Sequence, residues 1–541
     1  MKPRFLILLT LVLAGMFFIT NLFRSESSQK ISTVETVSIV AKNERKTEAK
    51  PIPVLIKNTE SMDRAFWSDS LLENLLLEEL NDVLLYVRNP LDLNDSLDNF
   101  EKGGFEVIDR IDELGTFRVK IYEPAKFMEF LVENDNEFGV YKNVTLKSPT
   151  YPDSRMLEVE EPFMGSSMDW LGVRPDRKDA GKGVKVAIID TGVDTSHVSL
   201  SGIKITEISL LNEDDSHGNL GHGTGITSVI AGQTEDFVGI APSTEILSVR
   251  VLNESGEGDS FTVAKGIVEA VDQGADIINL SLGGMDSSIV MDNAIEYAKL
   301  NNVLMVSAVG NEGVQGVSFP ARHKDVVAVA SVDAKSRVST FSNYGDEVDI
   351  AAPGVGVITA WEENEFIHFS GTSIATAFVT GALASELSYS SLEDKEDALN
   401  ALYANADEAE KPGKDIWAGR GVLNVRRLEQ RNTPGIVDAA VVGYYFDTEK
   451  ITSSGTTPFF VTIQNQGTSW LQSTNLKVNY KGLEKNFKIG SINAGESRSE
   501  MLYYDAGVPD KKLHITSELS ISGQTDQYPE NNTRQSFLIL P

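Results

Sequence analysis

The segment GVKVAIIDTGVD, residues 183–194, decides the fold of this chain. Residues 184–189 form a nearly unbroken apolar run, which is typical of a strand buried on both faces of a parallel sheet. Asp190 follows the run directly, and Gly192 marks a turn. Because ligands of open parallel sheets bind beyond the carboxyl ends of the strands, this acid is a candidate catalytic group. The alternative is an acid that only caps the following turn.

Three further apolar runs, residues 245–249, 277–280 and 303–307, follow at intervals that leave room for helices. Strands that alternate with longer helical segments predict a parallel sheet covered by helices. We therefore expect an α/β domain from residue 183 to about residue 428.

Two smaller units flank this domain. Before it, residues 82–148 predict the order β-α-β-β-α-β, a ferredoxin-like α+β domain. Its expected strands are residues 83–87, 105–108, 117–121 and 140–146. After Pro434 the helical pattern stops, and short alternating runs between Gly, Asn and Pro turns predict an all-β sandwich over residues 434–541.

The N-terminus has the pattern of an export signal. Lys2 and Arg4 precede an uncharged run over residues 5–23, so residues 1–24 predict a signal peptide or a membrane anchor. The run is long for a cleaved signal and about long enough to cross a bilayer, and both alternatives stay open. Residues 25–81 predict a polar linker followed by an amphipathic segment. We expect an extracellular or cell-surface protein.

Composition excludes several classes of function. The chain has 79 acidic and 48 basic residues and a net charge of −31, which argues against nucleic acid as a partner. It has no cysteine, so disulfides, a thiol nucleophile and Cys-ligated metal sites are excluded.

Two more motifs carry nucleophilic chemistry. His222 lies between glycines in GHGTG, residues 221–225, at the start of an apolar helical segment, and could act as a general base if an acid orients it. Ser373 lies in SGTSIATA, residues 370–377, where a glycine turn leads into a helix whose positive end favours a developing oxyanion. Taken singly, each residue is more often a structural histidine or a helix N-cap serine.

Together, Asp190-Thr191-Gly192, His222-Gly223-Thr224 and Gly371-Thr372-Ser373-Ile374-Ala375 resemble the three signatures of the subtilisin-like serine protease family, the subtilases. The order Asp, His, Ser differs from the orders in chymotrypsin-type enzymes and α/β-hydrolases. The resemblance covers about residues 165–428. It implies that His222 takes the proton of Ser373, that Ser373 attacks a peptide carbonyl, and that Asp190 orients the imidazole.

The resemblance extends to the oxyanion site and the substrate groove. The segment SAVGNEG, residues 307–313, resembles the family's oxyanion-hole segment. The resemblance implies that the Asn311 side chain donates to the tetrahedral oxyanion. A substrate strand would lie between residues 256–258 and residues 282–284. The expected substrate-binding residues, which imply an apolar preference before the cleaved bond, are Gly256, Gly258, Ser281, Leu282, Gly283, Ala308, Val309 and Gly310.

Some positions depart from the family pattern. Ala377 and Phe378 replace the usual Pro-His pair, and Gly225 replaces a frequent histidine, but none of these groups takes part in proton transfer. Ser199 stands where calcium-binding relatives have an acid, and residues 231–239 are too short for their calcium loop. We therefore expect no cofactor in the chemistry and no metal ligands of the usual pattern. Weak binding of a structural calcium ion by acidic surface loops stays open as an alternative.

The flanking units also resemble known modules. Residues 82–147 are similar to the subtilisin prodomain, which implies a self-processing zymogen inhibited by its own prodomain and cleaved between about Pro149 and Gly165. Residues 434–541 faintly resemble the CARDB adhesion-type sandwich, which implies a cell-surface ligand. The expected partners are protein or peptide substrates, this prodomain and that ligand. The alternative function is a surface binding protein with a degenerate subtilase scaffold, although no triad residue is missing.

Overall fold

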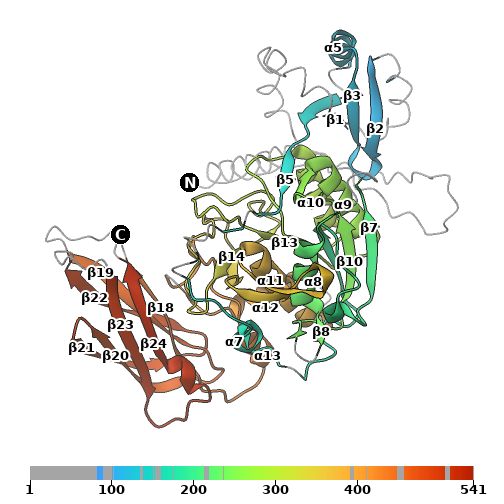
Figure 1. Ribbon diagram of the computed structural model, residues 1–541. Helices are drawn as coiled ribbons and strands as arrows, with labels where there is room; N and C mark the ends of the chain where they lie inside the picture. The colour runs from blue at the N-terminus through green and yellow to red at the C-terminus, as the bar shows by residue number, and fades with distance from the viewer. Residues whose placement is uncertain are drawn as a thin grey trace, which may run out of the picture. The chain divides into compact units, whose positions relative to one another are not determined.

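Seven parallel strands form the central sheet of the computed structural model (Figure 1), in the order β15-β14-β13-β12-β6-β10-β7. Four of them coincide with the apolar runs of the sequence, so the predicted parallel α/β fold is confirmed. The strands are β6 (Lys185–Asp190), β7 (Ile205–Ser209), β10 (Glu245–Arg250), β12 (Ile277–Leu280), β13 (Leu304–Ala308), β14 (Val327–Val332) and β15 (Ile350–Pro353).

The structure describes residues 82–88, 100, 103–134, 138–149, 151, 152, 157, 160–174, 176–211, 218–234, 237–389, 395–409, 411–446, 456–505 and 512–539. All of them belong to one of two units of the chain, residues 75–88 and 97–541. The predicted signal or anchor and the segment up to residue 81 lie outside the described residues.

Strand β6 occupies the point where the direction of the sheet reverses. From β6 the chain first builds β7 and β10 on one side and then β12 to β15 on the other. Such a reversal opens a crevice at the carboxyl ends of the strands, where ligands bind. Asp190 is the last residue of β6 and therefore lies at this crevice.

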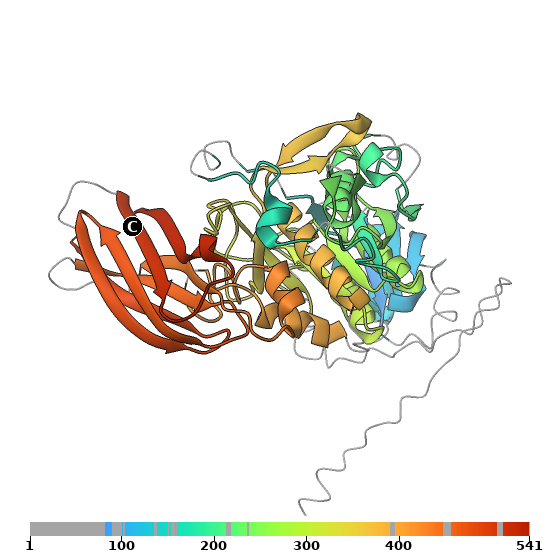
Figure 2. The ribbon, with the colours of Figure 1, turned by 90° about the horizontal axis from the view of Figure 1, so that it is seen from below.

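Helices cover both faces of the sheet (Figure 2). Helices α8 (Gly221–Ala231) and α11 (Thr372–Tyr389) pack with one set of strand side chains, and α9 (Ser260–Asp272) and α10 (Ile289–Leu300) with the other. Every residue of α11 from Thr372 to Glu386 is buried, as expected of a helix that is apolar all round. The smaller elements are α7 (Ser167–Leu171), α12 (Lys395–Ala404), α13 (Val425–Gln430), β8 (Gln233–Thr234), β9 (Phe237–Val238), β16 (Val357–Ala360), β17 (Phe366–Phe369), η3 (Asp112–Leu114), η4 (Val198–Leu200), η6 (Glu362–Asn364) and η8 (Pro529–Asn532).

The N-terminal domain is an antiparallel sheet in the order β2-β3-β1-β4 with helix α5 (Pro124–Glu133). This strand order is that of the predicted ferredoxin-like unit, and six phenylalanine rings of the described residues form part of its core. Its strands are β1 (Val83–Val87), β2 (Phe105–Ile111), β3 (Thr116–Ile121) and β4 (Phe138–Lys142).

The predicted strand at residues 140–146 is divided in the structure. Strand β4 ends at Lys142, and β5 (Thr145–Lys147) pairs instead with β11 (Glu257–Asp259) of the α/β domain. Asn143 stabilises the break, because its Oδ1 accepts hydrogen bonds from Ser260 Oγ (2.9 Å) and from the Phe261 N–H (3.1 Å). The chain therefore leaves one sheet and joins another within a single apolar run.

The C-terminal domain is a sandwich of two antiparallel sheets, in the orders β18-β19-β22 and β21-β20-β23-β24. Their inner faces share one apolar core, as the alternating pattern predicts. The strands are β18 (Ala439–Phe446), β19 (Thr456–Asn465), β20 (Leu471–Tyr480), β21 (Leu483–Ile492), β22 (Ser497–Asp505), β23 (Lys512–Ile521) and β24 (Thr533–Ile539).

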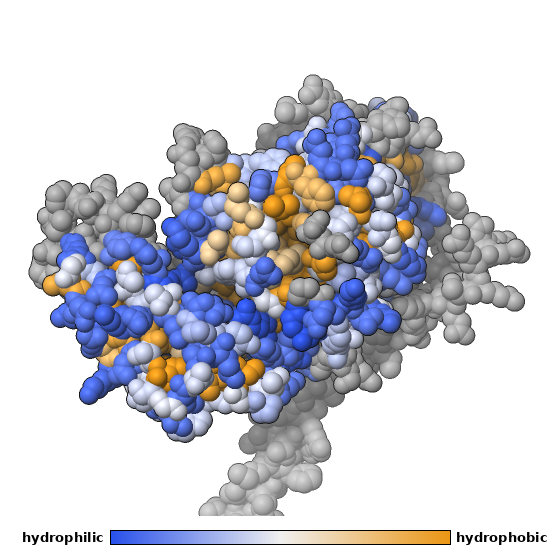
Figure 3. Space-filling view, turned by 60° about the horizontal axis from the view of Figure 1, so that its bottom comes forward, coloured by the Kyte–Doolittle hydropathy of each residue, from blue (hydrophilic) through white to orange (hydrophobic). Residues whose placement is uncertain are grey.

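The face of the molecule seen in Figure 3 is mostly hydrophilic, apart from an area in its upper part where apolar residues gather.

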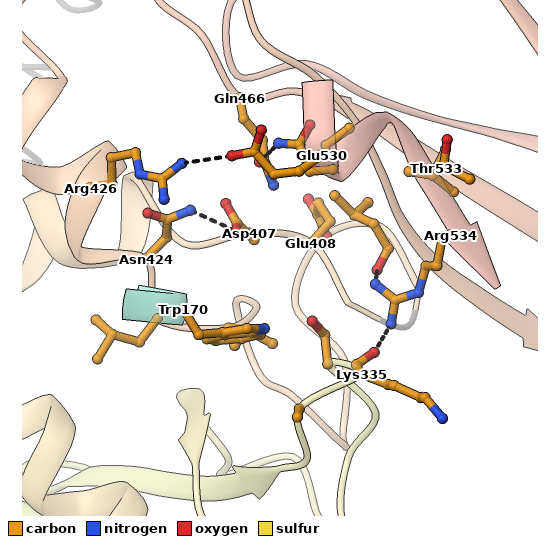
Figure 4. Close-up of a pocket in the computed structure, with 18 of the residues that line it drawn as sticks. Trp170, Lys335, Asp407, Glu408, Asn424, Arg426, Gln466, Glu530, Thr533 and Arg534 are labelled. Atoms are coloured by element: carbon orange, nitrogen blue, oxygen red, sulfur yellow. Dashed lines mark hydrogen bonds and ion pairs between the residues drawn. The ribbon is translucent and has the colours of Figure 1, made fainter. Parts of the chain in front are cut away.

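Polar contacts join the C-terminal and α/β domains around a cavity of about 630 Å³ (Figure 4). Arg426 of the α/β domain pairs with Glu530 of the C-terminal domain (3.7 Å). Within the α/β domain, Asn424 donates to Asp407 Oδ2 (2.8 Å). The guanidinium of Arg534 donates to the Val442 carbonyl (2.8 Å) and to that of Lys335. The Arg426–Glu530 ion pair and the Arg534–Lys335 hydrogen bond therefore form a joint between the two domains beside this cavity.

Asp438 is a buried carboxyl group beside this joint, with 4% of its surface exposed. Its pKa is raised to about 7, mainly by burial and also by the nearby Asp526 and Asp407, although a hydrogen bond from Asn531 (2.8 Å) acts in the opposite direction. The Asp438 carboxyl group binds its proton more tightly in the folded state than in the unfolded chain. The stability of the folded protein should therefore fall as the pH rises from about 4 to 7.

Asp438→Asn should remove that loss, because the amide keeps an acceptor for Asn531 and carries no charge. A pKa raised from 3.8 in the unfolded chain to about 7 in the folded protein lowers the free energy of unfolding by roughly 4 kcal/mol at alkaline pH. Thermal unfolding in a Ser373→Ala background should show stabilisation at pH 8 and little at pH 4. Asp176→Asn, at an exposed carboxylate, is the control. An equal effect of Asp438→Asn at both pH values would contradict the assignment.

Candidate active site

A short hydrogen bond joins Asp190 and His222, which lie 32 residues apart in the sequence. The Nδ1–H of His222 donates to Asp190 Oδ1 over 2.7 Å, and the Thr191 N–H donates to the same oxygen (2.7 Å). Both side chains are buried, with 0% and 6% of their surfaces exposed. Because Nδ1 carries the proton, Nε2 is the basic nitrogen, and among the described residues it has no hydrogen-bond partner.

Glycine in the GHG motif makes this contact possible. A Cβ on Gly223 would lie 2.1 Å from the carbonyl oxygen of Gly192, in the turn after Asp190. Only a glycine lets the first turn of α8 approach the end of β6 so closely.

Ser373 and Asn311 meet at the N-terminus of α11. The Thr372 N–H and Oγ1 both donate to Asn311 Oδ1, each over 2.9 Å. With its oxygen held, the amide presents Nδ2 beside Gly371, where a Cβ would lie 3.0 Å from it. An amide donor next to the helix N-terminus that carries Ser373 is the arrangement that stabilises a tetrahedral oxyanion.

The two expected edges of the groove lie on either side of β5. Lys147 exchanges two backbone hydrogen bonds with Gly283 (3.0 and 2.7 Å), and the Ser148 N–H donates to the Gly256 carbonyl (2.9 Å). Gly258 pairs with Leu146 in the β11–β5 register. At Gly256, with φ +72°, a Cβ would lie 2.5 Å from Ser148 Oγ, so a side chain there would obstruct the groove.

The other expected substrate-binding residues are buried. Leu282 follows the end of β12 and precedes Gly283, Ala308 is the last residue of β13, and the Val309 side chain packs into a separate apolar cluster. Gly310 follows directly and leads to Asn311. Ser281 differs from expectation, because its hydroxyl accepts from Asn279 (2.9 Å) and donates to the Ser373 carbonyl (3.2 Å). It supports the nucleophile from inside the protein.

The β16–β17 hairpin contributes residues that the sequence analysis did not find. The Phe369 ring lies 5.6 Å from the His222 ring, and Trp361 packs against Gly221, where a Cβ would be 2.1 Å from the indole. Glu362 accepts from the Leu220 N–H (3.1 Å), and Leu220 caps α8 without any side-chain hydrogen bond of its own. The only sequence signal was a cluster of aromatic and acidic residues ahead of Ser373.

The predicted departures from calcium binding concern Ser199 and residues 231–239. Ser199 is fully buried and bonds to His197 Nδ1 through its N–H (3.1 Å) and hydroxyl (2.8 Å). Residues 231–239 contain the short β8–β9 hairpin. Within the described ranges, no group of three or more His, Cys, Asp or Glu could hold a metal ion. Independence from cofactors stays a prediction.

Residues 181–421 match the subtilase family, peptidase S8. Over 256 residues the chain is 33% identical to subtilisin DY of Bacillus licheniformis, which covers 46% of this chain and 92% of that protein. The chain belongs to the subtilase family. Over 206 residues this subtilase is 40% identical to a thermostable alkaline protease of Halalkalibacterium halodurans, covering 38% of the subtilase and 56% of that relative. These matches to serine proteases make it a serine endopeptidase, as the triad predicts.

A solved structure shares the fold of the subtilase. The epidermin leader peptide processing serine protease of Staphylococcus aureus aligns with a TM-score of 0.55 and 23% identity. The alignment covers 64% of this chain and 98% of that one. The likeness therefore extends beyond the 45% of the chain, 241 of 541 residues, that matches the subtilase family.

Asn311→Ala should lower kcat about 10²–10³-fold with little change in KM, because it removes a donor that acts mainly on the transition state. The measurement is steady-state kinetics on a peptide substrate. Asn486→Ala, on an exposed strand of the C-terminal domain, is the matched control and should keep wild-type kcat. An Asn311→Ala enzyme with unchanged kcat would exclude this residue from the oxyanion site.

Proposed function

We propose that this subtilase is an extracytoplasmic endopeptidase that is made as a self-processing zymogen and hydrolyses peptide bonds through an acyl-enzyme. One observation carries the proposal. Residues 145–148 are hydrogen-bonded as a strand between β11 and Gly283, in the groove that leads to the triad. A segment of the chain thus lies where the substrate of a subtilase would lie.

The proposed reaction uses each group in turn. Ser373 Oγ attacks the scissile carbonyl while His222 Nε2 accepts its proton, and Asp190 stabilises the resulting imidazolium. The tetrahedral oxyanion accepts hydrogen bonds from Asn311 Nδ2 and the Ser373 N–H. His222 then donates the proton to the leaving amine, which leaves an acyl-Ser373. Water, deprotonated by His222, releases the second product and regenerates the serine.

Contacts of the N-terminal domain support its role as an inhibitor. The N-terminal domain contributes four apolar side chains to the buried cluster that α9 and α10 form, namely Leu84, Ile111, Leu114 and Leu146. Arg118 pairs with Asp259 (3.3 Å), and Lys265 with Asp109 (2.6 Å). Burial of apolar surface favours docking, and β5 then occupies the groove against any other peptide.

The same contacts narrow the proposed processing site. Lys147 is bound at Gly283, and the Tyr151 ring lies 5.4 Å from that of Phe369, which borders His222. Partial burial and then the negative Asp190 raise the pKa of Tyr151 to about 12, so Tyr151 is within electrostatic reach of the triad. We expect cleavage between Ser148 and Tyr151, at the N-terminal end of the range that the sequence predicts.

Export and surface attachment complete the proposal. The charged and apolar pattern of residues 1–24 supports export, with a cleaved signal and a retained anchor both open. Among the residues that the structure describes, no helix is long and apolar enough to cross a membrane. For the C-terminal sandwich we propose a cell-surface ligand. The alternative of a degenerate scaffold is disfavoured by the Asp190–His222 hydrogen bond.

The wild-type chain should convert itself to a form whose N-terminus lies between Ser148 and Tyr151, whereas Ser373→Ala should stay full length. Intact-mass and N-terminal peptide analysis after expression of both forms measures this directly. Added wild-type enzyme should cleave Ser373→Ala at the same place. If both forms stay full length and neither cleaves denatured protein, the proposed function is wrong.

A further inference from the structure

We infer that Glu257 gives the groove a preference for substrates with a basic side chain at the position that Lys147 occupies. The inference rests on the proposed function, in which residues 145–148 lie as a substrate does. It adds a preference for positive charge on the substrate, which the backbone hydrogen bonds of the groove do not provide.

Backbone geometry makes Glu257 the neighbour of any side chain at this position. Lys147 directs its N–H and carbonyl to Gly283, whereas the N–H of the next residue, Ser148, donates to the Gly256 carbonyl of the opposite edge. Lys147 and Glu257 are thus a directly opposed antiparallel pair without hydrogen bonds between them. In such pairs the side chains lie on the same face at their closest spacing. A substrate in the same register would meet the same carboxylate.

Glu257 is itself held in place. Its N–H donates to Asn253 Oδ1 (3.0 Å), and its carbonyl accepts from the Asn253 N–H (2.9 Å). Both backbone groups therefore face away from the groove occupant, and the carboxylate reaches the Lys147 ammonium as an ion pair. The side chains are 56% and 41% exposed, so the pair lies at the rim of the groove.

The adjacent position has the opposite character. Leu146 is fully buried in a cluster with Leu252 and Phe261, and its Cδ2 would lie 3.3 Å from a Cβ on Gly284. Apolar burial there supplies affinity without regard to charge. The rim position distinguishes basic from acidic substrates, since a carboxylate in place of Lys147 would face Glu257 and be repelled by it.

The expected effect is modest because the pair is exposed. An exposed ion pair changes binding about twofold to fivefold relative to a neutral side chain, and like charges disfavour binding to a similar degree. A basic substrate should therefore exceed an acidic one about tenfold in kcat/KM at low salt. Salt near 1 M should remove most of the difference.

The first test uses self-processed enzyme and quenched peptides that copy residues 143–151, with Lys, Gln or Glu at the position of Lys147. Wild type should prefer Lys over Glu about tenfold in about 20 mM salt. Glu257→Gln should abolish the preference, and Glu257→Lys should reverse it. Glu254→Lys makes the same charge change at an exposed residue of the same loop and should keep the wild-type preference.

The second test uses the full chain. Lys147→Glu should slow self-processing about tenfold, and adding Glu257→Lys should restore the wild-type rate. Thermal unfolding identifies any variant that fails to fold, and the neutral Glu257→Gln then replaces Glu257→Lys.

Two outcomes separate the inference from the function on which it rests. Cleavage of the Lys and Glu peptides at equal rates, or equal reversal by Glu257→Lys and Glu254→Lys, overturns the role of Glu257 and leaves the protease intact. Absence of all cleavage by wild type, of peptides and of itself, overturns the proposed function and this inference with it.

Discussion

The hydrogen bond between Asp190 and His222 is the contact on which the active site depends. It requires that β6 end where the direction of the sheet reverses. It also requires that the first turn of α8 approach that end so closely that only a glycine fits at residue 223. The bond holds the proton on Nδ1 and leaves Nε2 as the basic nitrogen of the imidazole. The β16–β17 hairpin contacts the same helix through Glu362 and Phe369. The parallel sheet therefore sets the position of the base, and α11 sets that of Ser373.

Backbone groups do most of the recognition in the groove. The strand β5 is bound by main-chain hydrogen bonds on both sides, which any extended peptide could form. Side chains add selectivity at two neighbouring positions, a buried one filled by Leu146 and a rim position occupied by Lys147. Under the proposed function, one surface holds the N-terminal domain as an inhibitor and later receives substrates, because both present the same backbone.

The sequence predicted the parts of the fold and site that local patterns encode. Each triad residue lies in a short motif whose own glycines permit the contact, so Asp190, His222 and Ser373 could be found without the structure. The break at Asn143, the support from Ser281 and the hairpin with Glu362 could not, because each depends on a partner far away in the chain. The buried Asp438 was missed for the same reason, since its neighbours come from separate segments.

Covalent labelling of the nucleophile tests the central claim most directly. A fluorophosphonate probe followed by peptide mapping should place one adduct per chain on Ser373, and His222→Ala should prevent it, because the serine is reactive only beside its base. The processed enzyme should react much faster than the unprocessed chain, whose groove is occupied. An adduct on another residue, or equal labelling of Ser373 in His222→Ala, would contradict the account.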